Sequence, residues 1–329
     1  MKIFNKSLFF LLILFQFAVN SNTQPSNHDL KAYNKLFKTL NIKKEENIFE
    51  EASNLEEANT IMQKHFLRKP TLERNQLSED SFSSEQKNEM HKIFYSIGFL
   101  DSVLLFSNEH INERKDELKN DQEIYLVILG AYINTMRERI LYALEMIKKN
   151  KINPTKIIIL TGQRPLDEAN EGEVVLFDVQ YIRENWTFDA QTMQLPKNET
   201  QASEWIWDQI EKPDQIANIP IVFNSTPMKS NNTRANTEDT IMNLIKEGIP
   251  SNVHMIFVSN APFIQYQNES IKIAIVKNDI NVSFSTIGKA NLNTEEDPRF
   301  YQVLLDSLAR FVYSSVLLNK MIEQKNNKS

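Results

Sequence analysis

Hydrophobic positions along the chain change their spacing near residue 120. Before it, apolar residues recur every three or four positions, which predicts helices. One stripe comprises Leu30, Tyr33, Leu36, Phe37 and Leu40, and another comprises Ile93, Phe94, Ile97, Leu100, Val103 and Leu104. We therefore expect residues 28–107 to be wholly helical and to pack their stripes on the rest of the protein. The charged stretch 108–121 is expected to be a linker or an exposed helix.

After residue 120, short apolar runs alternate with amphipathic segments. The runs are VILGA (127–131), IILTGQ (158–163), IPIVFNST (219–226) and MIFVSNA (255–261). Each ends in small or polar residues and is followed by a helical pattern, which is typical of buried parallel strands. The repeated units predict an α/β, Rossmann-like fold, with a mostly parallel sheet of about five strands and helices on both faces, preceded by the helical segment.

The pattern also gives approximate boundaries. Strands are expected at 125–129, 156–160, 220–223 and 253–258, and helices at 135–149, 201–211 and 237–247. Two further apolar runs, 271–276 and a weaker one at 282–287, could extend the sheet. The last helix is expected to begin with Asp297 as cap and Pro298 in its first turn. The chain thus divides into a signal segment (1–21), a helical region (22–120), an α/β domain (121–320) and a polar tail (321–329).

The amino terminus is basic and then apolar. Lys2 and Lys6 precede an apolar stretch, 8–19, that only Gln16 interrupts. The stretch is shorter than the roughly 20 apolar residues that span a bilayer. It is typical of a cleaved secretory signal peptide, and the alternative is a retained membrane anchor. We expect cleavage near Ser21, export to the periplasm or the extracellular space, and no stable transmembrane segment afterwards.

The amino-acid composition limits the kinds of partner and of chemistry that are expected for this protein. Loss of Lys2 and Lys6 with the signal would move the formal charge from -6 to about -8, and an acidic surface disfavours nucleic acid as a partner. The absence of cysteine excludes disulfides, thiolate nucleophiles and Cys-zinc sites. Sequons at Asn185, Asn198, Asn224, Asn231, Asn268 and Asn281 are either chance products of an Asn-rich composition or surface glycosylation sites.

A succession of short motifs marks the α/β part. It comprises VILGA, Arg139 followed by Ile-Leu-Tyr-Ala, LTG (160–162), Ser203-Glu204 and Asn236-Thr237 opening two helices, and Val258-Ser259-Asn260 ending a strand. This order, over roughly residues 120–290, resembles the YdcF/SanA/ElyC-like family, a domain of unknown function found in bacterial envelope proteins. The resemblance implies a Rossmann-like fold and an association with the cell envelope.

The chain departs from that family at two places. The family reads T-x-E-N where this chain has Thr237, Glu238, Asp239 and Thr240. It has a His and an Arg after V-T-S where this chain has Phe263 and Tyr266. An acid survives as Asp239, whereas the His and the Arg are lost. The departures indicate a divergent member with its own ligand, or a protein that only binds.

The residue inventory disfavours several familiar chemistries. The histidines are His28, His65, His91, His110 and His254. The first four precede the α/β part and the last lies inside a predicted strand, so neither a His-based zinc site nor a Ser-His triad is expected at the sheet edge. No GxGxxG or GxxxxGK[ST] motif occurs. Acid and base chemistry would fall to Asp239 or Glu204, with a divalent cation such as magnesium as an open option.

Four arginines are placed near the carboxyl edge of the predicted sheet. They are Arg137 and Arg139 in the opening turns of a helix, Arg164 after the LTGQ turn, and Arg234 before the helix at 237. Arginines and helix amides at one edge suit a phosphate or carboxylate ligand. The alternative is that Glu138 and Asp239 neutralise the arginines in surface pairs. Because the helix dipole disfavours a cation at its start, we expect Arg139→Ala to leave the unliganded fold unchanged or slightly more stable.

The other candidates each have a structural alternative. Gly130 and Gly162 permit either tight turns or close approach of a ligand, and Asn236 and Thr237 are good helix caps. The acidic loop with Asp167, Glu168, Glu171 and Glu173 is either a solvated surface or a metal site. The predicted ligand-binding set is Gly130, Ala131, Arg137, Arg139, Gly162, Gln163, Arg164, Arg234, Asn236, Thr237, Ser259 and Asn260.

Together these features predict an exported, envelope-associated α/β protein that binds a small anionic ligand, phosphorylated or nucleotide-like, at the carboxyl edge of the sheet. In one hypothesis it is a non-catalytic accessory protein. In the other it is a hydrolase or transferase that acts on a phosphorylated envelope precursor, with Asp239 or Glu204 as acid, base or magnesium ligand and the arginines as clamps.

Overall fold

A computed structural model of the 329-residue chain describes residues 27–45, 48–69, 77–79, 81–100, 105–106, 123–189, 193–230, 233–250, 252–290 and 297–327. The predicted signal segment, 1–21, and the whole predicted linker, 108–121, lie outside the described residues. Among the helices that are described, none combines the length and the apolar character that crossing a bilayer requires.

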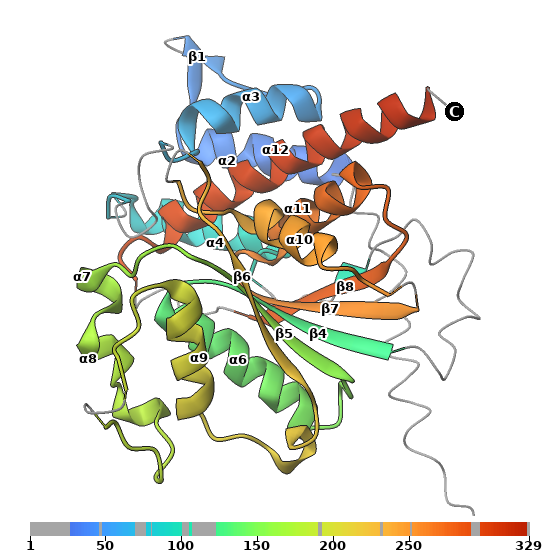
Figure 1. The fold of residues 1–329 in the computed structure, drawn as a ribbon. Coiled ribbons are helices and arrows are strands. Elements are labelled where there is room, and N and C mark those ends of the chain that lie inside the picture. The colour runs from blue at the N-terminus through green and yellow to red at the C-terminus, as the bar shows by residue number, and fades with distance from the viewer. Residues whose placement is uncertain are drawn as a thin grey trace, which may run out of the picture.

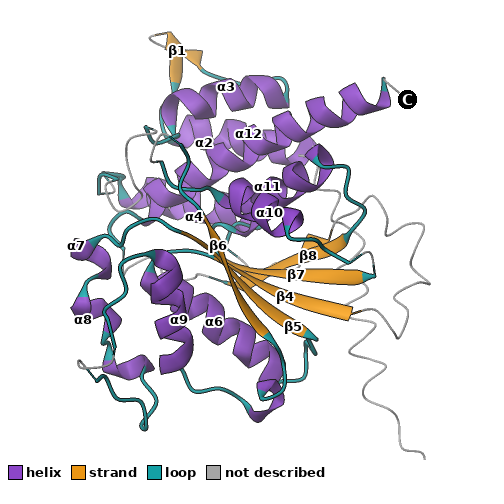
Figure 2. Ribbon diagram, in the orientation of Figure 1, coloured by secondary structure: helices purple, strands orange, loops and turns teal. Residues whose placement is uncertain are grey.

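A six-stranded sheet with the order β3-β8-β7-β4-β5-β6 forms the centre of the fold (Figures 1 and 2). Its strands are β3 (Leu105–Phe106), β4 (Glu123–Leu129), β5 (Lys156–Gly162), β6 (Ile221–Thr226), β7 (Val253–Asn260) and β8 (Ser283–Lys289). β4 to β8 are parallel, and β3 pairs antiparallel with β8 at one edge. The predicted Rossmann-like α/β fold is therefore confirmed.

Helices lie on both sides of this sheet, with α12 outside α11. They are α6 (Ile133–Lys148), α7 (Glu168–Glu171), α8 (Glu173–Leu176), α9 (Glu199–Gln209), α10 (Thr237–Lys246), α11 (Ile264–Lys277) and α12 (Phe300–Asn326), with single 3-10 turns at Val179–Tyr181 and Asp214–Ile216. α6 and α9 share a core with Leu126 and Ile128 of β4, and α10 and α11 share one with Val127 and Leu129. Successive strand residues face opposite sides, so one apolar run supplies both cores.

The amino-terminal helices form an outer layer. α2 (Asn27–Thr39), α3 (Leu55–His65) and α4 (Ser84–Ser96) share one hydrophobic core with α12, and α12 in turn packs on α11 (Figure 1). Tyr33, Leu36, Phe37, Ile93 and Phe94 of the predicted stripes are buried in this core. The partner of the stripes is therefore the last helix of the chain, and residues on both sides of the predicted boundary at 120 contribute to the same core.

Some predicted elements are wrong. Residues 28–107 are not wholly helical, because β1 (Lys43–Glu45) pairs with β2 (Ile48–Phe49) and β3 joins the sheet. The run 271–276 lies inside α11, as the apolar face of a buried helix. A short apolar run does not distinguish a buried strand from a buried helix. The weaker run at 282–287 does form a strand, β8.

Three further differences concern the last helix and the sequons. α12 begins at Phe300, and Asp297 is not its cap but accepts a hydrogen bond from the Arg299 amide at 2.9 Å in the preceding turn. The helix continues to Asn326, so most of the predicted polar tail is helical. Asn224 and Asn268 are buried, which excludes them as glycosylation sites of the folded protein.

Candidate functional site

A cavity of about 680 Å³ lies at the carboxyl edge of the sheet. Its inner part is formed by the segments that follow β4, β5 and β7 and by the start of α9, and its outer part by α10, α11 and α12. After β4 the chain adds β5 and β6 on one side and then β7 and β8 on the other, so the order reverses between β4 and β7. This switch point is where open α/β sheets form a ligand-binding crevice.

Arginine dominates the charged lining of the cavity. The lining includes Arg68, Arg139, Arg164, Arg234, Arg299 and Arg310, together with the carboxylates of Glu138, Glu199, Glu238 and Asp297. None of the lysines in the described part of the chain lines it. The whole chain has a formal charge of -6, whereas the lining has more arginines than carboxylates. The immediate lining is therefore more basic than the chain as a whole, and Glu171 and Asp306 behind it pair with Arg164, Arg68 and Arg310.

Arg139 joins the two strand ends at the switch point. Its Nε donates to Asn260 Oδ1 at 2.9 Å, and its Nη1 donates to the carbonyl oxygens of Leu129 and Gly130 at 2.8 Å. Its Nη2 donates to Gln267 Oε1 at 3.3 Å, and the residue is only 2% exposed. These hydrogen bonds mean that the Arg139 side chain stabilises the folded structure. They contradict the expectation that the unliganded fold does not need this side chain.

Arg137 lies away from the cavity. Its guanidinium donates to the carbonyl oxygens of Val175 and Leu176 at 2.5 and 2.6 Å and lies 5.1 Å from the ring centre of Tyr181. Burial lowers the pKa of Arg137. Residues two positions apart on an α-helix point about 200° apart, so Arg137 and Arg139 cannot face one ligand. The predicted ligand role of Arg137 is corrected to a structural one, which fastens α6 to α8.

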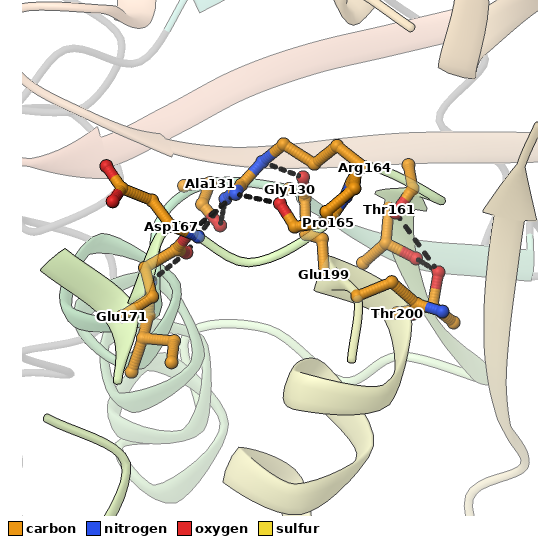
Figure 3. Close-up of polar contacts among 12 residues, drawn as sticks. Gly130, Ala131, Thr161, Arg164, Pro165, Asp167, Glu171, Glu199 and Thr200 are labelled. Atoms are coloured by element: carbon orange, nitrogen blue, oxygen red, sulfur yellow. Dashed lines mark hydrogen bonds and ion pairs between the residues drawn. The ribbon is translucent and has the colours of Figure 1, made fainter. Parts of the chain in front are cut away.

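Arg164 is held between two buried carboxylates (Figure 3). Its Nη1 and Nη2 donate to Glu171 at 2.5 and 2.8 Å, and its Nε pairs with Glu199 at 2.8 Å. Burial lowers the pKa of Arg164, but the hydrogen bonds with Glu171 and the charges of both glutamates outweigh it, so the pKa is raised. The partners of this arginine are thus buried, and they are not the surface carboxylates Glu138 and Asp239 that the sequence suggested.

Glu171 belongs to the acidic loop for which the sequence allowed two interpretations, a solvated surface or a metal site. It is 1% exposed, and it also accepts the amides of Ile133 at 3.2 Å and Asp167 at 3.0 Å. Since Ile133 opens α6, the carboxylate of Glu171 lies at the positive end of that helix. The carboxylate of Glu171 thus receives hydrogen bonds from a guanidinium and from two backbone amides.

Glu199 is the buried carboxylate on the cavity wall. It follows the helix cap Asn198 and lies against Gly130, where a Cβ would come within 2.2 Å of Glu199 Oε1. Burial raises the pKa of Glu199, and the charge of Arg164 opposes the rise. Glu171 and Glu199 share one arginine, and Glu171 has the additional amide donors. Glu199 is therefore a buried carboxyl group with a raised pKa and one charged donor.

The remaining predicted ligand residues separate into two groups. Gly130, Ala131, Gly162, Asn236, Thr237 and Asn260 line the cavity together with Arg139, Arg164 and Arg234. Gln163 is exposed beside it, and Ser259 donates to Gln267 in the core, so neither lines the cavity. Neighbouring residues of an extended chain point to opposite sides, which explains why Gly162 and Asn260 reach the cavity and their neighbours do not.

Neither predicted catalytic carboxylate lines the cavity. Glu204 is exposed on α9. Asp239 accepts the Asn236 amide at 2.8 Å in a capping box and pairs with Lys229 at 2.7 Å. Their acid or base role is therefore corrected to a surface role for Glu204 and a capping role for Asp239. Within the described ranges, no group of three or more His, Cys, Asp or Glu side chains could hold a metal ion.

The outer wall was missed by sequence reasoning. Asp306 is buried in α12 and pairs with Arg310 at 3.0 Å and with Arg68 at 3.7 Å. The Asp306–Arg310 spacing of four residues is a signal that the sequence does carry. Arg68 is distant from α12 in the sequence. It reaches the cavity only because the outer layer of helices packs there.

Comparison of the chain with protein-family models, with curated proteins and with solved structures found no match.

Proposed function

We propose that the protein binds a small anionic ligand with a phosphate group in the cavity at the carboxyl edge of the sheet. The observation that carries this proposal is the set of arginines that line one cavity at the switch point of an acidic protein. Guanidinium groups match phosphate oxygens in shape and charge, and a basic cleft concentrates anions.

The arginines contribute in two ways. The N–H groups of Arg139 and Arg164 donate to protein atoms, so these residues provide a fixed positive field. Arg234, Arg299 and Arg310 are partly exposed on the wall, and the Nε groups of Arg299 and Arg310 pair with Asp297 and Asp306 at 3.0 Å. Arg234 is also close enough to Glu199 to affect the pKa of that carboxyl, which puts its charge at the inner end of the cavity.

The start of α6 adds backbone donors. Glu171 accepts the amide of Ile133 at 3.2 Å, but the cap residue Tyr132 makes no side-chain hydrogen bond, and Asn134 and Thr135 in the first turn line the cavity. The first amides of a helix carry the positive end of its dipole. A phosphate at the inner end of the cavity would meet the amides of Asn134 and Thr135 together with Arg234.

Titration calorimetry with inorganic phosphate at low salt tests the proposal. Arg234→Ala should weaken binding by about tenfold to a hundredfold, the scale of a hydrogen bond to a charged group. Arg183→Ala is the matched control, because Arg183 pairs with Asp208 at 3.6 Å outside the cavity. Absence of phosphate binding by the wild-type protein, or equal affinity of wild type and Arg234→Ala, would contradict the proposal.

A second candidate function, an enzyme that cleaves a phosphate ester, is favoured by Glu199. A buried carboxylic acid with a raised pKa beside a bound phosphate can donate a proton to the leaving oxygen while water attacks phosphorus. Glu199→Gln keeps the shape of the side chain but has no proton to give. It should abolish release of inorganic phosphate from phenyl phosphate and keep phosphate binding. No release by the wild-type protein would leave only the binding function.

We also propose that the protein is exported and acts at the cell envelope. The support is the basic and apolar amino terminus and the likeness to the YdcF/SanA/ElyC-like family. Mass spectrometry of protein from the extracytoplasmic fraction should show a chain that starts near residue 22. An intact Met1 on that protein would contradict cleavage of the signal.

A further inference from the structure

The cavity continues away from the sheet edge as an outer groove, lined by Thr240, Tyr266, Ser270, Ile273, Tyr313 and Ser314. The three middle residues, at 266, 270 and 273, share one face of α11, and the others come from α10 and α12, which both pack against α11 (Figure 1). The stripe along α11 is about 10 Å long at the rise of an α-helix. The groove is therefore long enough for a ring attached to the phosphate.

Hydroxyl groups set the chemistry of the outer groove. Thr240 Oγ1 donates to the carbonyl oxygen of Thr237 at 2.9 Å, and Ser270 Oγ donates to that of Tyr266 at 3.0 Å. Each hydroxyl has thus used its one proton on its own helix and keeps lone pairs as acceptors. A ligand that satisfies these oxygens must itself carry hydrogen-bond donors.

The inner and outer parts of the cavity therefore favour opposite kinds of group. The inner part presents the guanidinium groups of Arg139, Arg164 and Arg234 and helix amides, which suit phosphate oxygens. Arg299 and Arg310 of the outer wall pair with Asp297 and Asp306 at 3.0 Å. The outer groove presents hydroxyl acceptors, and the ring of Tyr313, which is 50% exposed, adds a flat apolar face. A hydrocarbon chain in the groove would desolvate the hydroxyl oxygens without replacing their hydrogen bonds, which is unfavourable.

From this division we infer that the ligand is a phosphate ester of a sugar, with its phosphate at the sheet edge and its hydroxylated ring in the outer groove. The inference rests on the proposed anion site and names the class of molecule that would fill the rest of the cavity. A free sugar phosphate and a nucleotide share this chemistry, and they differ only in the attached base.

Calorimetric titration of the full chain with inorganic phosphate, ribose phosphate and adenosine monophosphate tests the inference. Ribose phosphate should bind about tenfold tighter than inorganic phosphate, as two or more added hydrogen bonds would give. Thr240→Val with Ser270→Ala should weaken ribose phosphate binding by about threefold to tenfold and leave inorganic phosphate binding unchanged. Tighter binding of adenosine monophosphate than of ribose phosphate would support a nucleotide as the source, and equal affinities would support a free sugar phosphate.

Thr39→Val with Ser96→Ala is the matched control. These hydroxyls donate to the carbonyl oxygens of Lys35 and Ile93 at 2.9 and 2.8 Å, in helices outside the cavity. Ribose phosphate binding no tighter than that of inorganic phosphate, or an equal loss for both ligands in the groove variant, would overturn the sugar assignment and leave the anion site standing. Failure of the wild-type protein to bind any of the three ligands would overturn the proposed function itself. If the groove variant does not fold, the wild-type affinities for ribose phosphate and inorganic phosphate still test the sugar assignment.

Discussion

Replacement of each carboxylate beside Arg164 by its amide should have unequal effects on stability. Glu171→Gln removes the charged partner of a guanidinium that is 7% exposed. We expect it to lower the free energy of unfolding by about 3 to 5 kcal/mol, the scale for one lost partner of a buried ion pair. Glu199→Gln replaces a carboxyl group whose pKa burial raises by a neutral group of the same shape, and it should cost less than about 1 kcal/mol.

The difference follows from the donors around each group. Glu171 accepts two hydrogen bonds from Arg164, at 2.5 and 2.8 Å, and two from the amides of Ile133 and Asp167, at 3.2 and 3.0 Å. An amide side chain has one acceptor oxygen, so its NH2 group would face donors. Glu199 receives Arg164 Nε at 2.8 Å, which the oxygen of a glutamine can also accept.

The pH dependence separates the two glutamates further. A raised pKa means that folded Glu199 holds its proton where the unfolded chain has lost it. The folded state then binds more protons, so the stability that Glu199 contributes decreases as the pH rises from the ordinary value of 4.5 through the raised pKa. Glutamine does not titrate, so Glu199→Gln should gain stability relative to wild type over this window.

Urea denaturation followed by circular dichroism, at several pH values, measures these differences. Glu204→Gln is the matched control, because Glu204 is exposed on the helix that carries Glu199, and it should change stability by less than about 0.5 kcal/mol. Equal losses for Glu171→Gln and Glu199→Gln, or a loss for Glu199→Gln that grows with pH, would refute the raised pKa of Glu199.

Three other predictions concern the fold around the site. Gly130→Ala should cost at least about 2 kcal/mol in thermal unfolding, because its Cβ would lie 2.6 Å from the carbonyl oxygen of Leu160, whereas Gly162→Ala, with its nearest neighbour at 3.9 Å, should cost about 1 kcal/mol or less. Arg139→Met should lower the free energy of unfolding by about 2 to 4 kcal/mol, since the strand-end carbonyls lose their donor, and unchanged stability in urea would show that the side chain does not hold the switch point together. Burial lowers the pKa of His254 to about 4, so stability should fall by as much as about 3 kcal/mol as the pH drops from 6.5 towards that value, and His254→Gln should flatten this part of the profile.

The parallel strands could be predicted because both of their faces are buried. Val127 and Ile128 face opposite cores, so β4 is apolar without interruption. The same property makes the run 271–276 resemble a strand, although it belongs to a helix that is buried on most sides. The short pairs β1–β2 and β3 carry no periodic signal, because two or three residues are too few for one.

The candidate site was predictable only in part. Arg139 and Arg164 were found because parallel strands place the segments that follow them at one edge. Arg137 could have been set aside from the helical angle alone. Glu199 was missed because the predicted helix began at residue 201, and its burial depends on contact with Gly130, which is distant in sequence. Long-range contacts of this kind are not encoded in local spacing.

The most direct test of the anion site is the position of a bound phosphate analogue. Tungstate has the tetrahedral shape of phosphate and a strong anomalous signal, so diffraction from crystals of the protein soaked in tungstate would locate it. We predict a peak inside the cavity, between the first turn of α6 and Arg234. Tungstate bound only outside this cavity, under conditions that saturate phosphate binding in solution, would contradict the assignment.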